Sequence, residues 1–322
     1  MAAGFLDQTL PDGGEYKHTK FSLAYLLDKP SPGHLFLAMY DHWFKHMCKF
    51  DDYLAARGQL EAAREPEDPL HNPYTFFSGQ DGTPVWSIMA QDQEKLRIFQ
   101  QGMSGIDVAI PVTGHFDFAL LRNSAEENER GIAELVDVGG GHGAVLKQIL
   151  DAYPEELSAR NAVLQDREDI ISLAKESGVL PENVKLMAHD FMTDQPVRGK
   201  FRIMSFFFNI MLIQFGTGAK AYFMRMILHD YADAVGIEIL KRLATAMDSK
   251  SRVLICEMVL PARVGEIDFP AAVMDQAVMT MGGKERTAEG FRKMFDAAGL
   301  ELVNVWRAPG VPGACVEGRL KQ

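Results

Sequence analysis

A cluster of glycines that directly follows an apolar stretch could bring bare backbone up to a ligand. Between residues 134 and 143 the sequence reads ELVDVGGGHG, and apolar residues recur at helical spacing after it. Glycine suits such a turn because a Cβ would block the close approach and because some turn residues take positive φ. The pattern predicts a buried strand, a tight turn and a helix, the unit that presents backbone N–H groups to nucleotide-like ligands.

The glycine turn by itself leaves three interpretations open. Gly139, Gly141 and Ala144 fit G-x-G-x-x-G/A, which is typical of dinucleotide binding. Asp137, with glycines at 139, 141 and 143, fits the acid-x-G-x-G-x-G pattern of methyltransferases that use S-adenosylmethionine (SAM). A glycine-rich turn without any ligand is the third interpretation, so residues downstream must decide.

Composition narrows the class of protein. The chain has 322 residues, 47% of them hydrophobic, and a net charge of −11, which disfavours nucleic acid as a partner. Its three cysteines are far apart and show neither metal-binding spacing nor a disulfide framework, and the N-terminus has no basic and apolar signal pattern. We therefore expect a cytoplasmic protein with no metal site and no membrane span.

The order of patterns along the chain predicts two regions. Residues 1–105 read as mainly helical, with a core-facing stripe between Phe36 and Met47 and one helix from about Val85 to Met103. From about Ile132, apolar runs alternate with helical patterns, which predicts an α/β fold with a mostly parallel sheet and helices on both faces. A run at Ala314–Leu320 after a Pro-Gly turn fits a closing antiparallel strand. We place this second domain at residues 106–322.

One segment of the second domain breaks its rhythm. Residues 199–217 are strongly apolar and stand where a short loop should connect two strands, yet they are too short and too polar for a membrane helix. Removing them would join Arg198 directly to Gly218. We therefore interpret this insert as the translation of a retained intron, which sequencing of the transcript tests.

Three short stretches accompany the glycine turn downstream: MILHDY at 226–231, ICEMVLP at 255–261 and GGKERT at 282–287. In this order, the four stretches resemble the plant and fungal class of SAM-dependent O-methyltransferases related to caffeic acid O-methyltransferase, and most closely its fungal secondary-metabolite members. The resemblance extends from about Tyr16 to the C-terminus. It implies a Rossmann-like SAM domain preceded by a helical dimerisation and substrate domain, here truncated.

The resemblance assigns a set of residues to SAM. Glycines of the turn would contact the methionine part, Asp166 the ribose, Asp190 and Phe191 the adenine, and Arg225 the cofactor side of the site. A carboxylate at the end of the second strand is well placed for two vicinal hydroxyls, although Asp166 alone could equally be a helix N-cap. The implied cofactor residues are Gly139, Gly140, Gly141, Asp166, Asp190, Phe191 and Arg225.

The resemblance also implies a general base, His229, flanked by two acids, Glu257 and Glu285. A phenol has a pKa near 10, so only about one molecule in a thousand is ionised at pH 7, a deficit of about 4 kcal/mol. A neutral imidazole can accept the phenol's proton while the two acids hold the ring. This chemistry needs no metal.

The substrate expected from the resemblance is a small aromatic phenol. Residues that would enclose its ring stand before the SAM domain and before the Gly-Gly-Lys-Glu loop; an ordinary core role is equally open for each. These candidates are Phe99, Met103, Met274, Asp275 and Met279.

The chain also departs from the family, because it lacks the family's first helices. We expect these to be needed for a strong homodimer. The expected activity is methyl transfer from SAM to a phenolic hydroxyl. The alternatives are a catalytically impaired relative that binds SAM weakly or associates with a homologue, and an NAD(P)-dependent oxidoreductase.

Overall fold

The computed structural model describes residues 4–10, 13–26, 31–103, 105–198, 202–203, 213–214 and 218–322. The chain divides into two compact units. The first comprises Met1–Val108 and Gln276–Gly282, and the second comprises Ala109–Asp275 and Gly283–Gln322. Helix α12 (Phe269–Met279) passes from the second unit into the first.

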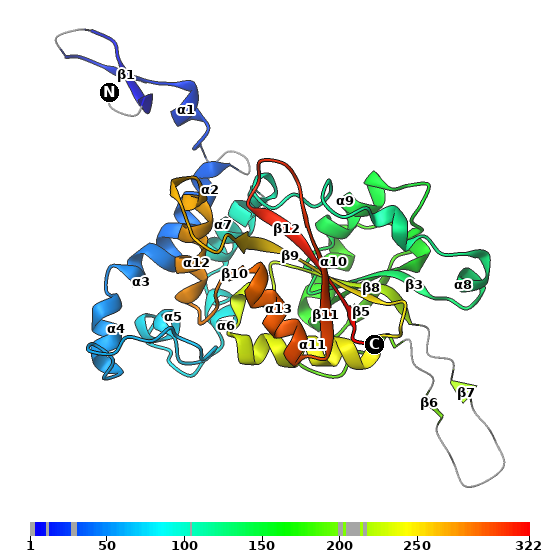
Figure 1. Ribbon diagram of the computed structural model, residues 1–322. Coiled ribbons are helices and arrows are strands. Elements are labelled where there is room, and N and C mark those ends of the chain that lie inside the picture. Colours follow the sequence, from blue (N-terminus) through cyan, green and yellow to red (C-terminus); the bar gives the residue numbers. More distant parts are fainter. Residues whose placement is uncertain are drawn as a thin grey trace. The chain divides into compact units, whose positions relative to one another are not determined.

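The first unit is helical apart from one small hairpin, β1 paired with β2, near the N-terminus (Figure 1). Its regular elements are β1 (Leu6–Gln8), β2 (Tyr16–His18), α1 (Lys20–Leu23), α2 (Pro32–Met39), the π-helix η2 (Tyr40–Phe44), α3 (Lys45–Met47), α4 (Phe50–Ala56), α5 (Pro73–Phe77), α6 (Val85–Met89), α7 (Gln93–Met103) and the 3₁₀ turn η3 (Ile106–Val108).

Two expectations for the first unit are wrong. The helix predicted over Val85–Met103 is interrupted between α6 and α7, where Asp92 accepts a hydrogen bond from the backbone N of Lys95. The stripe from Phe36 to Met47 does not face the core as a whole, because Phe36 is 55% exposed and Tyr40 48% exposed. Periodicity identified the helix, but it did not identify which of its faces is covered.

The second unit is built on one sheet with the strand order β11-β12-β9-β8-β3-β4-β5, and β10 pairs with β9. The strands β9, β8, β3, β4 and β5 are parallel, while β12 runs antiparallel to both of its neighbours. This arrangement confirms the mostly parallel Rossmann-like sheet and the closing antiparallel strand. The strands are β3 (Ala133–Val138), β4 (Ala162–Asp166), β5 (Lys185–Ala188), β8 (Ala219–Arg225), β9 (Arg252–Leu260), β10 (Arg286–Thr287), β11 (Leu300–Arg307) and β12 (Gly313–Leu320).

Helices cover both faces of this sheet (Figure 1). One face packs against α11 and α13, through residues such as Leu240 and Phe295. The other packs against α9 and α10, through residues such as Leu146 and Ile171. The helices and turns of this unit are η4 (Phe118–Leu121), α8 (Ala125–Glu129), α9 (Ala144–Ala152), η5 (Ala159–Asn161), α10 (Glu168–Ser177), η6 (Leu228–Asp230), α11 (Asp233–Ala246), η7 (Glu266–Asp268), the first part of α12, and α13 (Ala288–Ala297).

Strand residues alternate between these two faces, as the two-residue period of a β-strand requires. On β9, Val253 and Ile255 belong to the core of the α11/α13 face, whereas Leu254 and Cys256 belong to that of the α9/α10 face. The side chain of Glu257 therefore leaves β9 on the α11/α13 face, opposite to its neighbour Cys256.

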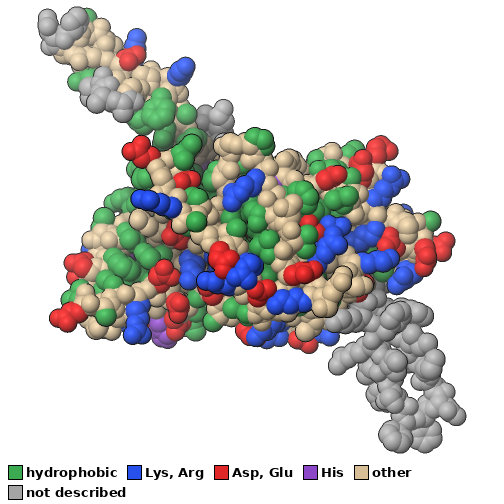
Figure 2. All heavy atoms as spheres, viewed as in Figure 1, with side chains coloured by type: hydrophobic (Ala, Val, Ile, Leu, Met, Phe, Trp, Pro, Cys, Tyr) green, Lys and Arg blue, Asp and Glu red, His purple; other side chains and the backbone are tan. Residues whose placement is uncertain are grey.

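The insert at 199–217 lies mostly outside the described residues. Its described parts are two short strands, β6 (Arg202–Ile203) and β7 (Ile213–Gln214), which pair antiparallel. No helix among the described residues is long and apolar enough to span a bilayer. Acidic and basic side chains are interspersed over the described surface drawn in Figure 2.

Candidate active site

The glycine turn follows β3. In the sheet, β4 and β5 lie on one side of β3, and β8 and β9 lie on the other, so the order in which the chain adds strands reverses at β3. Gly139 and Gly141 have φ values of 74° and 59°. A Cβ on Gly140 would lie 2.3 Å from Oδ2 of Asp137, whereas a Cβ on Gly141 would meet nothing within 4 Å. The turn thus packs tightly on its inner side and leaves its outer side open, as a backbone cradle for a ligand requires.

Asp166 ends β4 beside this turn. Its Oδ2 accepts a hydrogen bond from the backbone N of Gly141 at 2.9 Å, and its Oδ1 accepts one from the backbone N of Arg167 at 2.8 Å. The N-cap of α10 is Arg167 rather than Asp166, so the N-cap interpretation is wrong. Each carboxylate oxygen keeps a further lone pair, and two vicinal hydroxyls of a ribose could use them.

The other expected cofactor residues lie around the same edge of the sheet. Phe191 approaches the turn, because its ring carbon Cε1 would be 3.6 Å from a Cβ on Gly139. Asp190 is exposed, and its Oδ1 accepts a hydrogen bond from the backbone N of Met192. Arg225, the last residue of β8, donates from Nη2 to the carbonyl of Ile110 at 2.6 Å.

The segment that carries His229 is not a continuation of β8. Although residues 226–228 are apolar, β8 ends at Arg225 and Met226 takes a left-handed φ of 57°. His229 then lies in the 3₁₀ turn η6 and is 4% exposed. A left-handed conformation at a non-glycine residue is strained, and here it redirects the chain so that the histidine turns inward.

Arg286 and the Gly-Gly-Lys-Glu loop hold this turn in place. The buried guanidinium of Arg286 donates to the carbonyls of Leu228, at 2.9 Å, and Tyr231, at 2.6 Å. A Cβ on Gly283 would lie 2.0 Å from the carbonyl oxygen of His229. Only glycine therefore allows the loop to pass this close to the histidine.

The imidazole of His229 contacts two carboxylates. Its Nδ1 lies 2.8 Å from Oε1 of Glu285, and its Nε2 lies 3.4 Å from Oδ1 of Asp230. The backbone N of Glu285 donates to Oδ1 of Asp275 at 2.8 Å. Glu285 fixes the orientation of the ring and leaves Nε2 as the nitrogen available for chemistry.

Glu257 has a different role from the one expected of it. Its Oε1 accepts hydrogen bonds from the backbone N of His229, at 3.0 Å, and of Ile227, at 3.2 Å, rather than from the ring. The expectation that both acids hold the imidazole is therefore met only by Glu285. Glu257 positions the histidine through its backbone.

The carboxylates around His229 govern its protonation. Burial alone would lower the pKa of His229, but Asp230, Glu285 and Glu257 together raise it to about 10. Burial raises the pKa of Glu257 to about 7 and that of Asp230 to about 6, against the opposing charge of His229. The three carboxylates thus favour the protonated ring, whereas the sequence suggested a neutral imidazole with an ordinary pKa.

A family model described as "O-methyltransferase domain" matches residues 61–208 and 211–301, which is more than half of the chain. This chain belongs to the O-methyltransferase family. The gap between the two matched ranges lies inside the insert at residues 199–217. Members of the family take their methyl group from SAM, and the open glycine cradle and Asp166 fit that cofactor.

Fungal relatives support the same assignment. The methyltransferase cfoD of Aspergillus candidus is 30% identical over 325 residues, which cover 98% of this chain and 73% of the relative. The O-methyltransferase hmp5 of Hypomyces subiculosus is 34% identical over 275 residues, which cover 84% of this chain and 61% of the relative. The O-methyltransferase described here is therefore similar to fungal O-methyltransferases over nearly its whole length.

Solved structures agree with the fold. The structure of OxaC in complex with sinefungin and meleagrin has a TM-score of 0.79 and 26% identity, and it covers 100% of this chain and 73% of that one. The structure of LepI in complex with SAM, at 21% identity and a TM-score of 0.75, shares the fold and covers 98% and 73%.

The candidate substrate residues of this O-methyltransferase belong to both units. In the first unit, the ring of Phe99 contacts those of His42 and Trp86, at centroid distances of 5.5 and 5.8 Å; Met103 ends α7 and Met279 ends α12. In the second unit, Met274 is 6% exposed and Asp275 binds the backbone of Glu285. Asp275 thus has a structural partner in Glu285, the residue that contacts the ring of His229.

Two residues of the site were not identified by sequence reasoning. Asp230 was not among the expected site residues, although it lies beside Nε2 of His229 and its side chain is only 11% exposed. Arg286, which fixes the turn that bears His229, was not considered. Asp230 directly follows His229, and Arg286 directly follows Glu285. Their positions next to identified residues, within the same motifs, could have indicated them.

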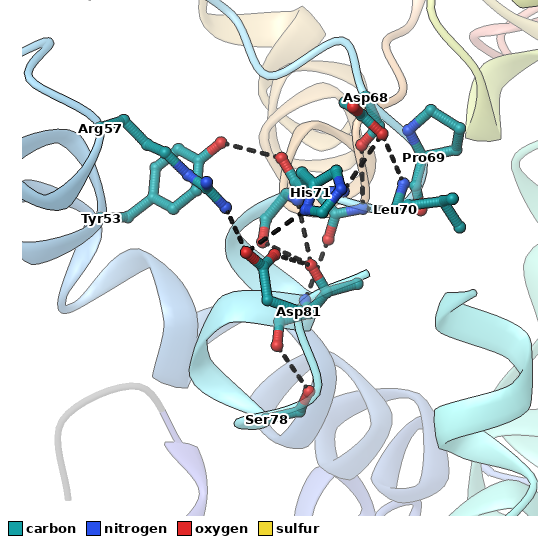
Figure 3. Close-up of polar contacts among 10 residues, drawn as sticks. Tyr53, Arg57, Asp68, Pro69, Leu70, His71, Ser78 and Asp81 are labelled. Carbon is teal, nitrogen blue, oxygen red and sulfur yellow. Dashed lines mark hydrogen bonds and ion pairs between the residues drawn. The ribbon is translucent and has the colours of Figure 1, made fainter. Parts of the chain in front are cut away.

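A separate polar cluster lies in the first unit (Figure 3). Oδ2 of Asp81 lies 2.8 Å from Nη2 of Arg57 and 3.3 Å from Nδ1 of His71. The hydroxyl of Tyr53 donates to the carbonyl of His71 at 3.2 Å. Tyr53, Arg57 and His71 border a hollow of about 250 Å³. The polar groups of the cluster mainly satisfy one another, so we assign the cluster a structural role.

Proposed function

We propose that this O-methyltransferase transfers the methyl group of SAM to a phenolic hydroxyl of a small aromatic secondary metabolite, with His229 as the general base. The observation that carries the proposal is the hydrogen bond between Nδ1 of His229 and Glu285 at 2.8 Å. It orients the ring and leaves Nε2 for the substrate. A carboxyl partner of this kind also stabilises the imidazolium that forms when the base takes a proton.

The glycine turn and the strand ends beside it would hold SAM. Gly139, Gly140 and Gly141 would contact the methionine part, Asp166 the ribose, and the segment from Asp190 to Phe191 the adenine, with Arg225 at the cofactor side. When bound, SAM supplies a methyl group on a cationic sulfonium. The open outer side of Gly141 and the remaining lone pairs of Asp166 support this placement.

His229 must be neutral to accept a proton, although its pKa is raised to about 10 in the protein alone. A positive charge bound nearby favours the neutral imidazole and lowers that pKa. Asp230, 3.4 Å from Nε2, would stabilise the imidazolium that forms when the ring accepts the proton. The pKa of His229 is therefore set by two opposing influences: the three carboxylates raise it, and the cationic cofactor lowers it.

We propose that Phe99, Met103, Met274, Asp275 and Met279 contribute to binding the aromatic ring. The half-buried ring of Phe99 and the flexible methionines suit a planar, irregular ligand. An impaired relative is not favoured, because the family model and the fungal relatives are O-methyltransferases. An oxidoreductase is not favoured either, because the chain belongs to the O-methyltransferase family.

We further propose that the protein forms a homodimer in the cytoplasm. Phe36, Tyr40 and Phe44 recur every four residues and are each at least 40% exposed, which is unusual for large apolar side chains on one helical stripe. All three cysteines are free thiols, as a reducing compartment favours. Light scattering of the protein and of a Phe36→Lys/Tyr40→Lys variant tests the dimer: the variant should be monomeric.

Titration of the purified protein with SAM, followed by single-turnover assays on a panel of phenols, tests the proposed function. We expect SAM to bind without NADH competition and at least one phenol to be methylated on oxygen. Binding of NADH in place of SAM would contradict the proposal.

A further inference from the structure

Three side chains that the proposed function does not use meet on the α9/α10 face of the sheet. The sulfurs of Cys256 and Cys315 and a ring nitrogen of His115 all lie within 4.8 Å of one another. Both cysteines are fully buried, with an exposure of 0%. The cluster adjoins the cofactor residues, because Cys256 is the register partner of Arg225 on the neighbouring strand.

The two cysteines stand directly opposite each other on the antiparallel strands β9 and β12. Three residue pairs further along the same two strands, the backbone N of Val259 donates to the carbonyl of Pro312. Hydrogen-bonded and non-hydrogen-bonded pairs alternate along an antiparallel ladder, so Cys256 and Cys315 form a non-hydrogen-bonded pair. The carbonyl of Cys256 accordingly accepts from Met226 on the other side of β9. In such pairs the Cα atoms are about 4.5 Å apart, within the range of roughly 4.4–6.8 Å that a disulfide spans.

The surroundings of Cys256 favour its thiolate form. Burial opposes ionisation, but hydrogen bonds from Cys315 and His115 and the charge of Arg225 lower the pKa of Cys256 below its usual value. Burial and the neighbouring Cys256 raise the pKa of Cys315. One residue of the pair is thus suited to act as a nucleophile, and the other keeps its proton.

The state of His115 favours redox chemistry over metal binding. The backbone N of Phe116 donates to Nδ1 of His115 at 2.7 Å, so Nε2 carries the ring hydrogen of the neutral imidazole. That Nε2 lies 2.7 Å from the carbonyl of Pro111 and 3.6 Å from Sγ of Cys256. A metal would need the lone pair of Nε2 and would also face the positive charge of Arg225.

We propose that Cys256 and Cys315 form a peroxide-oxidisable dithiol that closes into an intramolecular disulfide beside the cofactor residues. The sulfur of Cys256 attacks one oxygen of hydrogen peroxide, the O–O bond breaks, and hydroxide leaves and takes up a proton from solvent as water. The sulfur of Cys315 then attacks the sulfenic sulfur. The S–O bond breaks, and hydroxide leaves with the thiol proton of Cys315 as a second water. Two electrons pass from the sulfurs to the peroxide, and a dithiol reductant reverses the change.

Oxidation would act on the cofactor side of the site. It removes the thiolate charge beside Arg225 and ties β9 to β12 one residue before Glu257. Since bound SAM carries a net positive charge, losing a negative charge nearby weakens its binding, by about fivefold if the interaction is worth about 1 kcal/mol. This consequence rests on the proposed function, whereas disulfide formation does not.

The test uses the full chain carrying Cys48→Ser, because Cys48 is the exposed cysteine. After hydrogen peroxide, we expect an intact mass lower by two hydrogens (about 2 Da), a crosslinked peptide pair containing Cys256 and Cys315, and recovery with dithiothreitol. In the Cys48→Ser/Cys315→Ser variant, dimedone should instead trap a sulfenic acid on Cys256. A His115→Phe substitution in the Cys48→Ser background should slow the oxidation, because it removes the Nε2–H donor.

Two results would overturn the proposal. One is that both thiols remain fully alkylatable after peroxide treatment and subsequent unfolding. The other is equimolar zinc in the purified protein, lost in Cys256→Ser, with the thiols resistant to peroxide, since that would make the cluster a metal site. Mass spectrometry reports the disulfide whether or not methyl transfer is observed, so failure here is distinct from failure of the proposed function.

Discussion

Cys256 and Glu257 are neighbours on one strand, yet they serve opposite faces of the sheet. On the α11/α13 face, Glu257 holds the backbone of His229, and Glu285 holds its ring. On the α9/α10 face, Cys256 belongs to the hydrophobic core, and it is the register partner of Arg225 on the neighbouring strand β8. If the proposed roles hold, the end of β9 separates the acid–base residues from the cofactor residues, so substitutions on the two faces should impair different kinetic parameters.

The largest effect is expected on the α11/α13 face. His229→Ala removes the proposed base, so the rate constant for methyl transfer should fall by about 10³-fold while the Kd for SAM stays nearly unchanged. Single-turnover rates and calorimetric titration measure the two quantities. His18→Ala, at an exposed histidine of the first unit, is the matched control and should change neither. A large loss of SAM affinity in His229→Ala would give the residue a binding role.

A second comparison separates the two acids on that face. Glu285→Gln removes the carboxylate that holds Nδ1, and the methyl-transfer rate should fall roughly 10–100-fold. Glu257→Gln keeps an oxygen that can accept from the backbone of Ile227 and His229, so we expect at most about a threefold loss. Equal losses in the two variants, measured on the same phenol, would show that the ring contact has no special importance.

Substitutions of the proposed cofactor residues should change the affinity for SAM rather than the rate of methyl transfer. Asp166→Asn removes a charged acceptor at the end of β4, and the Kd for SAM should rise about tenfold, the scale of one charge-assisted hydrogen bond. The rate at saturating SAM should change little. Calorimetry and rate measurements on the same preparation check both statements. A lower methyl-transfer rate at saturating SAM, with an unchanged Kd for SAM, would contradict the proposal that the two faces have separate roles.

The smallest effects concern the stability of the glycine turn. In Gly140→Ala the new Cβ would meet Oδ2 of Asp137 at 2.3 Å, and we expect a loss of about 1–3 kcal/mol in the free energy of unfolding. In Gly141→Ala there is open space, and only the φ of 59° is unfavourable, at about 1 kcal/mol. Urea unfolding of the pair measures the difference. A larger loss for Gly141→Ala would contradict the tight inner packing of the turn.

The sequence predicted the sheet and the glycine turn because both have strong local patterns. Alternating apolar runs specify strands, and only glycine suits the turn after β3. The environment of His229 could not be predicted in the same way, because it depends on the left-handed Met226 and on Arg286, which lies 57 residues beyond His229. The same limit explains Phe36 and Tyr40, since a helical stripe does not reveal what covers it.

The pH dependence of single-turnover methyl transfer, with SAM saturating and two phenols of different pKa, tests the central claim most directly. Because the reactive imidazole is the neutral form and its pKa is raised, the rate should rise with pH through a limb at the same position for both phenols. In Glu285→Gln that limb should move to lower pH by about one unit or more, and in His229→Gln it should vanish. A limb that persists unchanged in His229→Gln, or that moves only with the pKa of the phenol, would contradict a base at position 229.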